Sequence, residues 1–213
     1  MKIKNFLILV VLTFFFTGIP DVHSKAKEGP ADLIKKADKC RKTFLQAAKK
    51  RKYSHNWIKC ISLYEKVFSG YPRSDQAPWA LYHCAGLYTG LYNYSGRSKD
   101  LNAALRLYSR IIKKYTNHRL ADDAQYLTGE IYYKKKKDAL RAYKEFLKVD
   151  KKFPRGDMRL KAGKRINELS IILKKTRPSP KTAKGTSGKT SKGSSGLLKK
   201  ADECRKTLLK SDK

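Results

Sequence analysis

The chain has 213 residues, with 50 Lys or Arg against 18 Asp or Glu, so its formal net charge is +32 at pH 7. This length suffices for one helical domain with a contiguous core. The charge predicts salt-dependent attraction to polyanions. The four cysteines lack C-x-x-C spacing, which argues against a redox or zinc motif; they are Cys40, Cys60, Cys84 and Cys204.

Residues 1–24 have the organisation of a secretory signal peptide. Lys2 and Lys4 precede an apolar stretch over 6–19, and residues 22–24 form a small-residue cleavage pattern. The alternative is an uncleaved membrane anchor, although the stretch is shorter than the ~20 residues a spanning helix needs. We expect a periplasmic or secreted protein without a transmembrane span. Cleavage after residue 24 leaves 48 basic and 17 acidic residues, a net charge of +31.

The segment 30–175 is expected to be an all-α domain. An amphipathic helix from Pro30 to about Lys50 is followed by a second helix that begins near Trp57. Ser74 is a plausible cap for a third helix, in which Pro78 comes early enough to be tolerated. Residues 93–100 predict a turn-rich loop before the next helix, which covers about 101–115.

Residues 120–154 predict a complete helical hairpin. Apolar residues recur at three-and-four spacing in both halves, and the basic run 134–137 between them cannot be buried. Asp138 is a plausible N-cap for the second half, and Pro154 ends it. A single helix over about 157–173 then stands where helical arrays place a cap.

The hairpin recurs along the chain. Aligning Tyr71, Tyr115 and Phe153 also aligns three further sets of residues, which we expect in the core: Tyr64, Tyr108 and Phe146; Ala80, Ala124 and Ala162; Leu87, Ile131 and Leu169. Small residues are needed where helices approach closely, and large ones where they interlock. The repeat resembles the tetratricopeptide pattern of about 34 residues, on Gly129, Tyr132, Ala142, Phe146 and Pro154. The expected fold is a tetratricopeptide-like solenoid of helical hairpins with a capping helix.

Cys60 falls at a position where the repeat needs a small buried residue, and Cys84 lies on the inner stripe of the next helix. Buried thiols are the preferred interpretation for both. A bridge between these two is the alternative, if their Cα atoms lie within about 7 Å.

The composition changes after residue 175. Residues 176–196 are rich in Ser, Thr, Gly, Pro and Lys, which predicts a disordered basic linker. Residues 197–213 then nearly copy the first helix, because 199–207 match 35–43 at eight of nine positions. This duplicated helix is expected either to dock on the array or another molecule, or to begin a further part of a longer protein.

The blocks 118–133 and 153–158 carry a resemblance that extends over about residues 32–173. The chain resembles the N-terminal tetratricopeptide-like (TPR) region of exported bacterial N-acetylmuramoyl-L-alanine amidases. It is more distantly similar to the repeats of the outer-membrane assembly lipoprotein scaffold and of the Tol-Pal coordinator protein. In the amidases, the resemblance implies, a basic linker leads to a zinc hydrolase domain that cuts the cell wall.

This chain lacks the motifs of that hydrolase domain. A zinc amidase needs histidines and a carboxylate on the metal, plus a carboxylate to activate water. Beyond the signal peptide only His55, His83 and His118 remain, without an H-E-x-x-H pair, and we interpret them as cap or surface residues. Asp122 and Asp123 complement the dipole at a helix start. We therefore predict no catalytic residues, no metal site and no cofactor.

The expected function is binding. In a tetratricopeptide array the first helix of each hairpin lines the concave side, where aromatic and charged side chains suit a peptide or glycan strand. The predicted groove residues are Trp79, Tyr82, Asp123, Tyr126, Glu130, Tyr133, Lys161 and Lys164. Each of them has packing against its neighbours as an equal alternative.

Three functions follow from these features. The first is a non-catalytic adaptor of the cell envelope, with an envelope protein, a peptide or peptidoglycan as partner. The second is the N-terminal fragment of an N-acetylmuramoyl-L-alanine amidase, and the third is an outer-membrane or Tol-Pal assembly scaffold. Nucleic acid is not an expected partner, because the signal peptide directs the chain away from it, and the sequence leaves the oligomeric state open.

Overall fold

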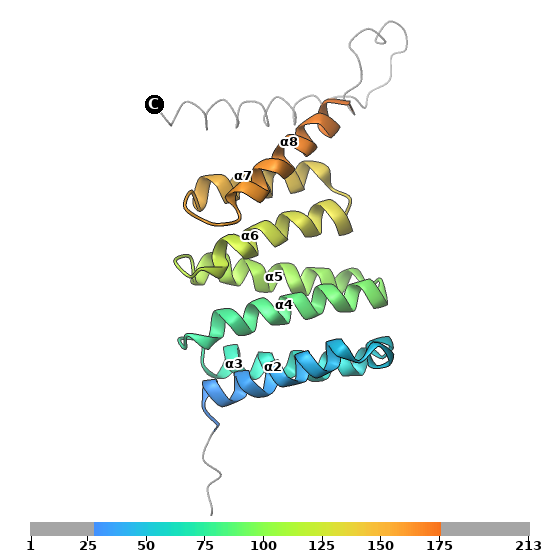
Figure 1. The fold of residues 1–213 in the computed structure, drawn as a ribbon, viewed down its shortest axis with the longest axis vertical. Coiled ribbons are helices and arrows are strands. Elements are labelled where there is room, and N and C mark those ends of the chain that lie inside the picture. Colours follow the sequence, from blue (N-terminus) through green and yellow to red (C-terminus); the bar gives the residue numbers. More distant parts are fainter. Residues whose placement is uncertain (1–27, 176–213) are drawn as a thin grey trace, which may run out of the picture.

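The computed structural model describes residues 28–175, and this part of the chain is entirely helical, without a strand (Figure 1). The all-α prediction is confirmed. The seven α-helices are α2 (Pro30–Gln46), α3 (Ser54–Gly70), α4 (Gln76–Ser95), α5 (Ser98–Lys114), α6 (Leu120–Glu130), α7 (Ala139–Lys152) and α8 (Arg159–Lys175). The predicted signal peptide, linker and duplicated helix lie outside the described residues.

The helices stack in chain order, each antiparallel to the one before it (Figure 1). Every helix packs chiefly on its sequence neighbours, with smaller contacts between α2 and α4 and between α4 and α6. This is a helical repeat-like architecture. None of the described helices combines the length and the apolar character needed to cross a lipid bilayer.

The turns before α4, α6 and α8 are three copies of one structure. The C-cap residues of α3, α5 and α7 have nearly the same φ: -134° at Tyr71, -127° at Tyr115 and -129° at Phe153. The N–H of each donates to the carbonyl four residues earlier, at 2.9 to 3.0 Å, and each carbonyl accepts from the N–H three residues later. The hydroxyls of Tyr71 and Tyr115 donate to carbonyls 43 residues earlier, those of Glu28 and Pro72. The repeat register predicted from the sequence is therefore present in the backbone.

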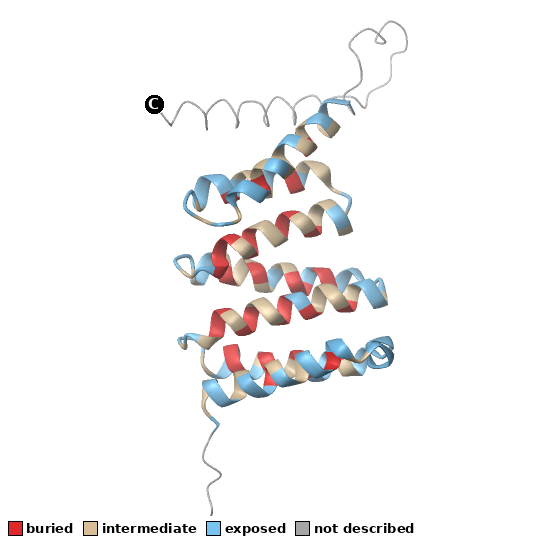
Figure 2. Cartoon of the chain, viewed as in Figure 1, coloured by how far each residue is buried: buried red, intermediate tan, exposed pale blue. Residues whose placement is uncertain are grey.

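The aligned positions belong to the core, as predicted, and Figure 2 shows buried residues distributed along the helix stack. Ala80, Ala124 and Ala162 are completely buried. Small side chains at these positions let successive helices approach closely. The two other aligned sets are at most 3% exposed, and they are Tyr64, Tyr108 and Phe146, and Leu87, Ile131 and Leu169. Burial of each large side chain contributes about 1.5–3 kcal/mol.

Several predicted boundaries were wrong for local reasons. The first helix ends at Gln46 rather than near Lys50, and a short 3₁₀ helix, η1 (Ala48–Lys52), follows it. Residues 93–95 belong to α4 rather than to a loop, and the turn is only Gly96 and Arg97. Gly96 makes this possible with a left-handed φ of 67°, which ends a helix in one residue.

The two predicted caps had different outcomes. The Asp138 carboxylate accepts the Arg141 N–H at 2.9 Å, so its role as N-cap of α7 is confirmed. Ser74 does not cap α4 with its side chain. Its hydroxyl instead donates backwards to the Tyr71 carbonyl at 2.8 Å, because the repeated turn presents that acceptor. Between α6 and α7 the chain widens into a π-helical turn, η2 (Ile131–Lys135).

A disulfide joins α2 to α3 through Cys40 and Cys60, whose Cα atoms are 5.6 Å apart. The prediction of a buried thiol at Cys60 was therefore wrong, and so was the alternative bridge to Cys84. The crossing of the first two helices decides the pairing, because it places the two Cα atoms within the range of a disulfide. Cys84 is a buried free cysteine, as predicted, and burial raises the pKa of its thiol.

Candidate binding face

The first helices of the successive pairs are α2, α4, α6 and α8. The predicted groove residues lie on α4, α6 and α8, except Tyr133, which is in the η2 turn after α6. Trp79, Tyr82, Asp123, Tyr126, Glu130 and Tyr133 are half-buried, whereas Lys161 and Lys164 are exposed. Side chains from one first helix interact with those of the next along this row. We call this row the first-helix face, and its members are Asp38, Arg41, Trp79, Tyr82, His83, Arg119, Asp123, Tyr126, Glu130, Tyr133, Lys161, Lys164, Arg165 and Glu168.

At the α2 end of the face, a hydrogen-bonded group surrounds the buried Tyr64. Its hydroxyl donates to Asp38 at 2.5 Å and accepts from the Arg41 guanidinium at 2.9 Å. Burial, assisted by Asp38, raises the pKa of Tyr64. The ring of His83 lies 5.6 Å from that of Tyr64, and burial followed by the Arg41 charge lowers the pKa of His83. His83 is thus a packed residue rather than a cap or a surface residue, because its ring lies among the rings of Tyr64, Trp79 and Tyr82.

Trp79 is the aromatic centre of the face. Its ring stacks on His83 at 6.3 Å and meets the edge of His118 at 5.8 Å. The guanidinium of Arg119 lies 5.1 Å from the same ring, in cation–π geometry. His118 was expected to be a cap or a surface residue, and its ring accepts the N–H of Leu120, the first residue of α6, at 3.2 Å. Burial, together with the Arg119 charge, lowers the pKa of His118.

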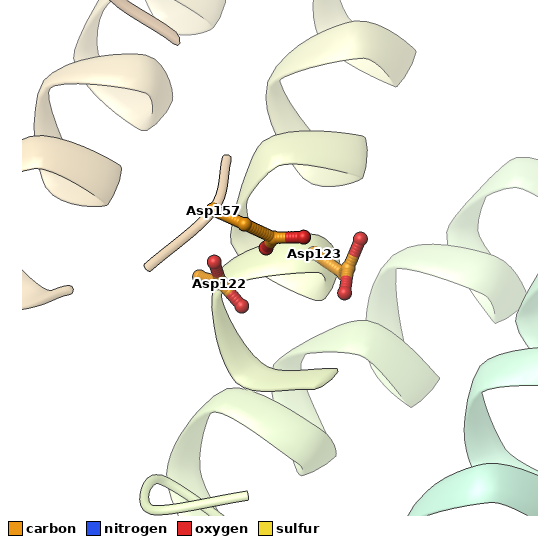
Figure 3. A group of neighbouring side chains, drawn as sticks. All are labelled: Asp122, Asp123 and Asp157. Atoms are coloured by element: carbon orange, nitrogen blue, oxygen red, sulfur yellow. The ribbon is translucent and has the colours of Figure 1, made fainter. Parts of the chain in front are cut away.

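Three carboxylates meet where the α7–α8 turn crosses the start of α6 (Figure 3). Oxygens of Asp122, Asp123 and Asp157 lie within 4.8 Å of one another. Burial, and then Asp122 and Asp157, raise the pKa of Asp123. Burial, followed by Asp123 and Asp157, raises the pKa of Tyr82. No local pattern in the sequence predicts this grouping, because Asp157 lies more than thirty residues from the pair on α6.

Carboxylate oxygens are suitable ligands for hard cations such as Ca²⁺ or Mg²⁺. In this group, however, Asp122 already has a structural role, since its Oδ2 accepts the Met158 N–H at 3.2 Å ahead of α8. Gly156 allows the approach, because a Cβ on it would lie 2.3 Å from the same oxygen. Asp122 therefore anchors the third copy of the repeated turn, in addition to its place in the first turn of α6.

An ion-pair network joins α6 to α8. The Arg165 guanidinium donates to Glu130 at 2.8 Å and to Glu168 at 2.7 Å. It also lies 5.6 Å from the ring of Tyr133, whose hydroxyl donates to Glu168. These hydrogen bonds from Tyr133 and Arg165 lower the pKa of Glu168. Glu130 and Tyr133 thus hold the last helix in place.

The other predicted residues differ in how accessible they are. Tyr126 packs on Phe146 with ring centroids 5.3 Å apart. Lys161 acts on Asp123 only through its charge, and Lys164 is exposed. The predicted residues therefore form two groups, one around Trp79 and Tyr82 and one between α6 and α8. Sequence reasoning missed Asp38, Arg41, His83, Arg119, Arg165 and Glu168, although their helical spacing on the first helices was a usable signal.

The fold and this face define residues 28–175 as an all-α region with helical repeat-like architecture and a mixed aromatic and charged face. A comparison with protein-family models and with curated proteins found no match to the chain.

Proposed function

We propose that this chain is a non-catalytic, tetratricopeptide-like binding and scaffold module of the bacterial cell envelope. Its partner would be peptidoglycan or an envelope protein that remodels it. The observation that supports the proposal is the first-helix face, on which aromatic rings from α4 and from the α6–η2 segment lie beside charged groups from α2, α6 and α8. Such a face provides contact area through its rings and orientation through its charges, which an extended peptide or glycan strand requires.

The repeated turns support the tetratricopeptide-like assignment. In three consecutive units the chain uses the same turn, and the first helix after it presents its residues to the same side. A partner that is itself extended can then contact equivalent positions of successive units. The signal-peptide pattern at residues 1–24 and the resemblance over residues 32–173 support the location in the envelope.

A pull-down with purified cell-wall sacculi, at low and at high salt, tests the glycan form of this proposal. We expect salt-sensitive retention of the protein. The double variant Lys161→Glu and Lys164→Glu on α8 should lose it, because both lysines are exposed on the face. The matched control is Lys144→Glu and Lys151→Glu on α7, which are also exposed but lie on a second helix. Equal retention of both variants, or no retention at all, contradicts a glycan ligand on this face.

A photoreactive side chain at Lys164, followed by crosslinking in cells, tests the protein form. Capture of a cell-wall hydrolase or of an outer-membrane assembly component distinguishes a remodelling partner from an assembly scaffold. The amidase-fragment alternative rests on the resemblance in residues 118–133 and 153–158. Reading the gene beyond codon 213 tests it, since a zinc-amidase domain there supports the fragment.

A further inference from the structure

One end of the helix stack carries all the turns within the helical pairs. Because consecutive helices are antiparallel, the connections α2–α3, α4–α5 and α6–α7 lie together, on the right in Figure 1. The C-terminal end of α8 reaches the same side. The connections between pairs lie at the opposite end. We call the end that carries the connections within the pairs the turn edge.

The turn edge is strongly basic. Its cations are residues 49–52 (KKRK) in η1, Arg97 in the second turn with Lys99 at the start of α5, and residues 134–137 (KKKK) in the third turn. All four residues of 49–52 are exposed, and among the described residues none of them is in an ion pair. Positive charge therefore accumulates in successive units along one line.

The few acidic groups near this edge are used internally. Asp100 is only 4% exposed and accepts hydrogen bonds from Ser95 at 2.6 Å and from Arg97 at 3.2 Å. Asp138 caps α7. At the opposite end, in contrast, the turns bring Asp75, Asp122, Asp123 and Asp157 among the cations. The two ends of the stack thus differ in charge balance.

Exposed apolar side chains gather on the same edge. Four of the six large hydrophobic residues that are exposed in the described chain lie there: Leu45 (38%), Tyr53 (58%), Ile58 (45%) and Tyr94 (52%). An open pocket of about 350 Å³ separates Tyr94 from Arg51 and Lys52, and Trp57 and Gly90 also line it. The turn edge therefore combines cations with aromatic and aliphatic groups.

We propose that the turn edge binds the surface of an anionic lipid bilayer. Lysine clusters are attracted to anionic headgroups, and tyrosine rings are enriched at the level of the headgroups. Exposed aliphatic residues such as Leu45 and Ile58 gain free energy by entering the interface, which a purely polar polyanion does not provide. The protein would stand with its helix ends on the membrane, and its first-helix face would remain free for another partner. This inference does not rest on the proposed function.

Lys137 provides a variant that separates charge from folding. It is the one non-glycine residue in the described chain with a positive φ, at 56°. Glycine adopts this conformation without steric cost, so Lys137→Gly removes a charge from the edge while it relieves strain. We therefore expect Lys137→Gly to fold normally, so that a loss of membrane binding in this variant reports the lost charge.

Co-sedimentation with lipid vesicles tests the proposal on the full chain. The turn-edge variant carries Lys49→Gln, Lys50→Gln, Lys52→Gln and Lys137→Gly. The matched control changes four exposed lysines at the opposite end to Gln: Lys113, Lys114, Lys151 and Lys152. All forms keep residues 1–27 and 176–213, so differences between them report on the edge. The vesicles are phosphatidylcholine, alone or with about a third phosphatidylglycerol.

We expect the partition coefficient on anionic vesicles to fall by about fivefold for each lysine removed from the edge, and to fall little for the control. Tyr53→Ser with Tyr94→Ser should weaken the same binding severalfold. Equal losses in the turn-edge variant and the control overturn the proposal. A second pair of results also overturns it: the turn-edge variant no longer binds polyglutamate, and the tyrosine variant binds vesicles as well as the original chain does. The edge would then be a site for linear polyanions.

Discussion

The backbone of Gly129 on α6 lies directly against the ring of Phe146 on α7. A Cβ on Gly129 would come within 2.6 Å of the ring, and Phe146 is itself completely buried. The contact fixes the distance between the two helices of this pair. Gly86 on α4, in contrast, has no neighbouring atom within 4 Å of where its Cβ would stand.

We expect Gly129→Ala to lower the free energy of unfolding by about 1–3 kcal/mol, because the buried ring must shift. Gly86→Ala should raise it by about 0.5–1 kcal/mol, since alanine is the better helix former and meets open space. Urea unfolding followed by circular dichroism measures both. A stabilised Gly129→Ala protein would show that the two helices are not in this contact.

The disulfide between Cys40 and Cys60 should stabilise the first helical pair. Closing a loop of 20 residues contributes about 3 kcal/mol through the unfolded state. We expect Cys40→Ser to lower the melting temperature under oxidising conditions and to be indistinguishable from the original chain under reducing conditions. Peptide mapping without reductant should recover the Cys40 and Cys60 peptides as one linked species, and recovery of a Cys60–Cys84 link would contradict this pairing.

The three carboxylates at the start of α6 predict a pH dependence of stability. Because the pKa of Asp123 is raised in the folded state, folding binds a proton between the ordinary pKa of an aspartate and the raised value. The free energy of unfolding should therefore fall as the pH rises through that window, and the loss persists at neutral pH. Asp123→Asn should remove this slope and stabilise the protein at pH 7.

Lys161 provides the complementary variant, because its charge lowers the pKa of Asp123. In Lys161→Gln the window should extend to higher pH. Thermal melts from pH 4 to 8 measure both slopes, and an unchanged slope in Asp123→Asn would show that the titrating group is another one.

The network around Arg165 should hold α8 on α6. Arg165→Ala removes the ion pair between α8 and the half-buried Glu130, which keeps its ion pair with Lys134, and we expect this to cost about 1–3 kcal/mol locally. Hydrogen exchange should then accelerate in α8 and stay unchanged in α2–α4. Arg159→Ala is the control, because its ion pair with Asp150 is exposed on both sides and such pairs contribute about 0–1 kcal/mol. Equal acceleration in both variants would contradict a specific role for Arg165.

The sequence by itself determined the helical class, the register of the repeat and most of the core. Helical periodicity is a local property and identifies the repeats. Aligning the repeats was then enough to predict that Ala80, Ala124 and Ala162 are buried. The Asp138 cap was equally accessible, because its partner lies three residues away. Boundaries were less predictable, since a single left-handed residue, Gly96, shortened a loop that composition alone suggested.

Only the tertiary structure decided which residues meet between helices. The pairing of Cys40 with Cys60, the approach of Asp157 to Asp123 and the bond from Arg165 to Glu130 all depend on how neighbouring helices cross and rotate. These residues are 20 to 35 positions apart, and no local pattern encodes the angle between two helices. The same is true of the turn edge, where antiparallel packing brings three separate basic turns to one side of the molecule.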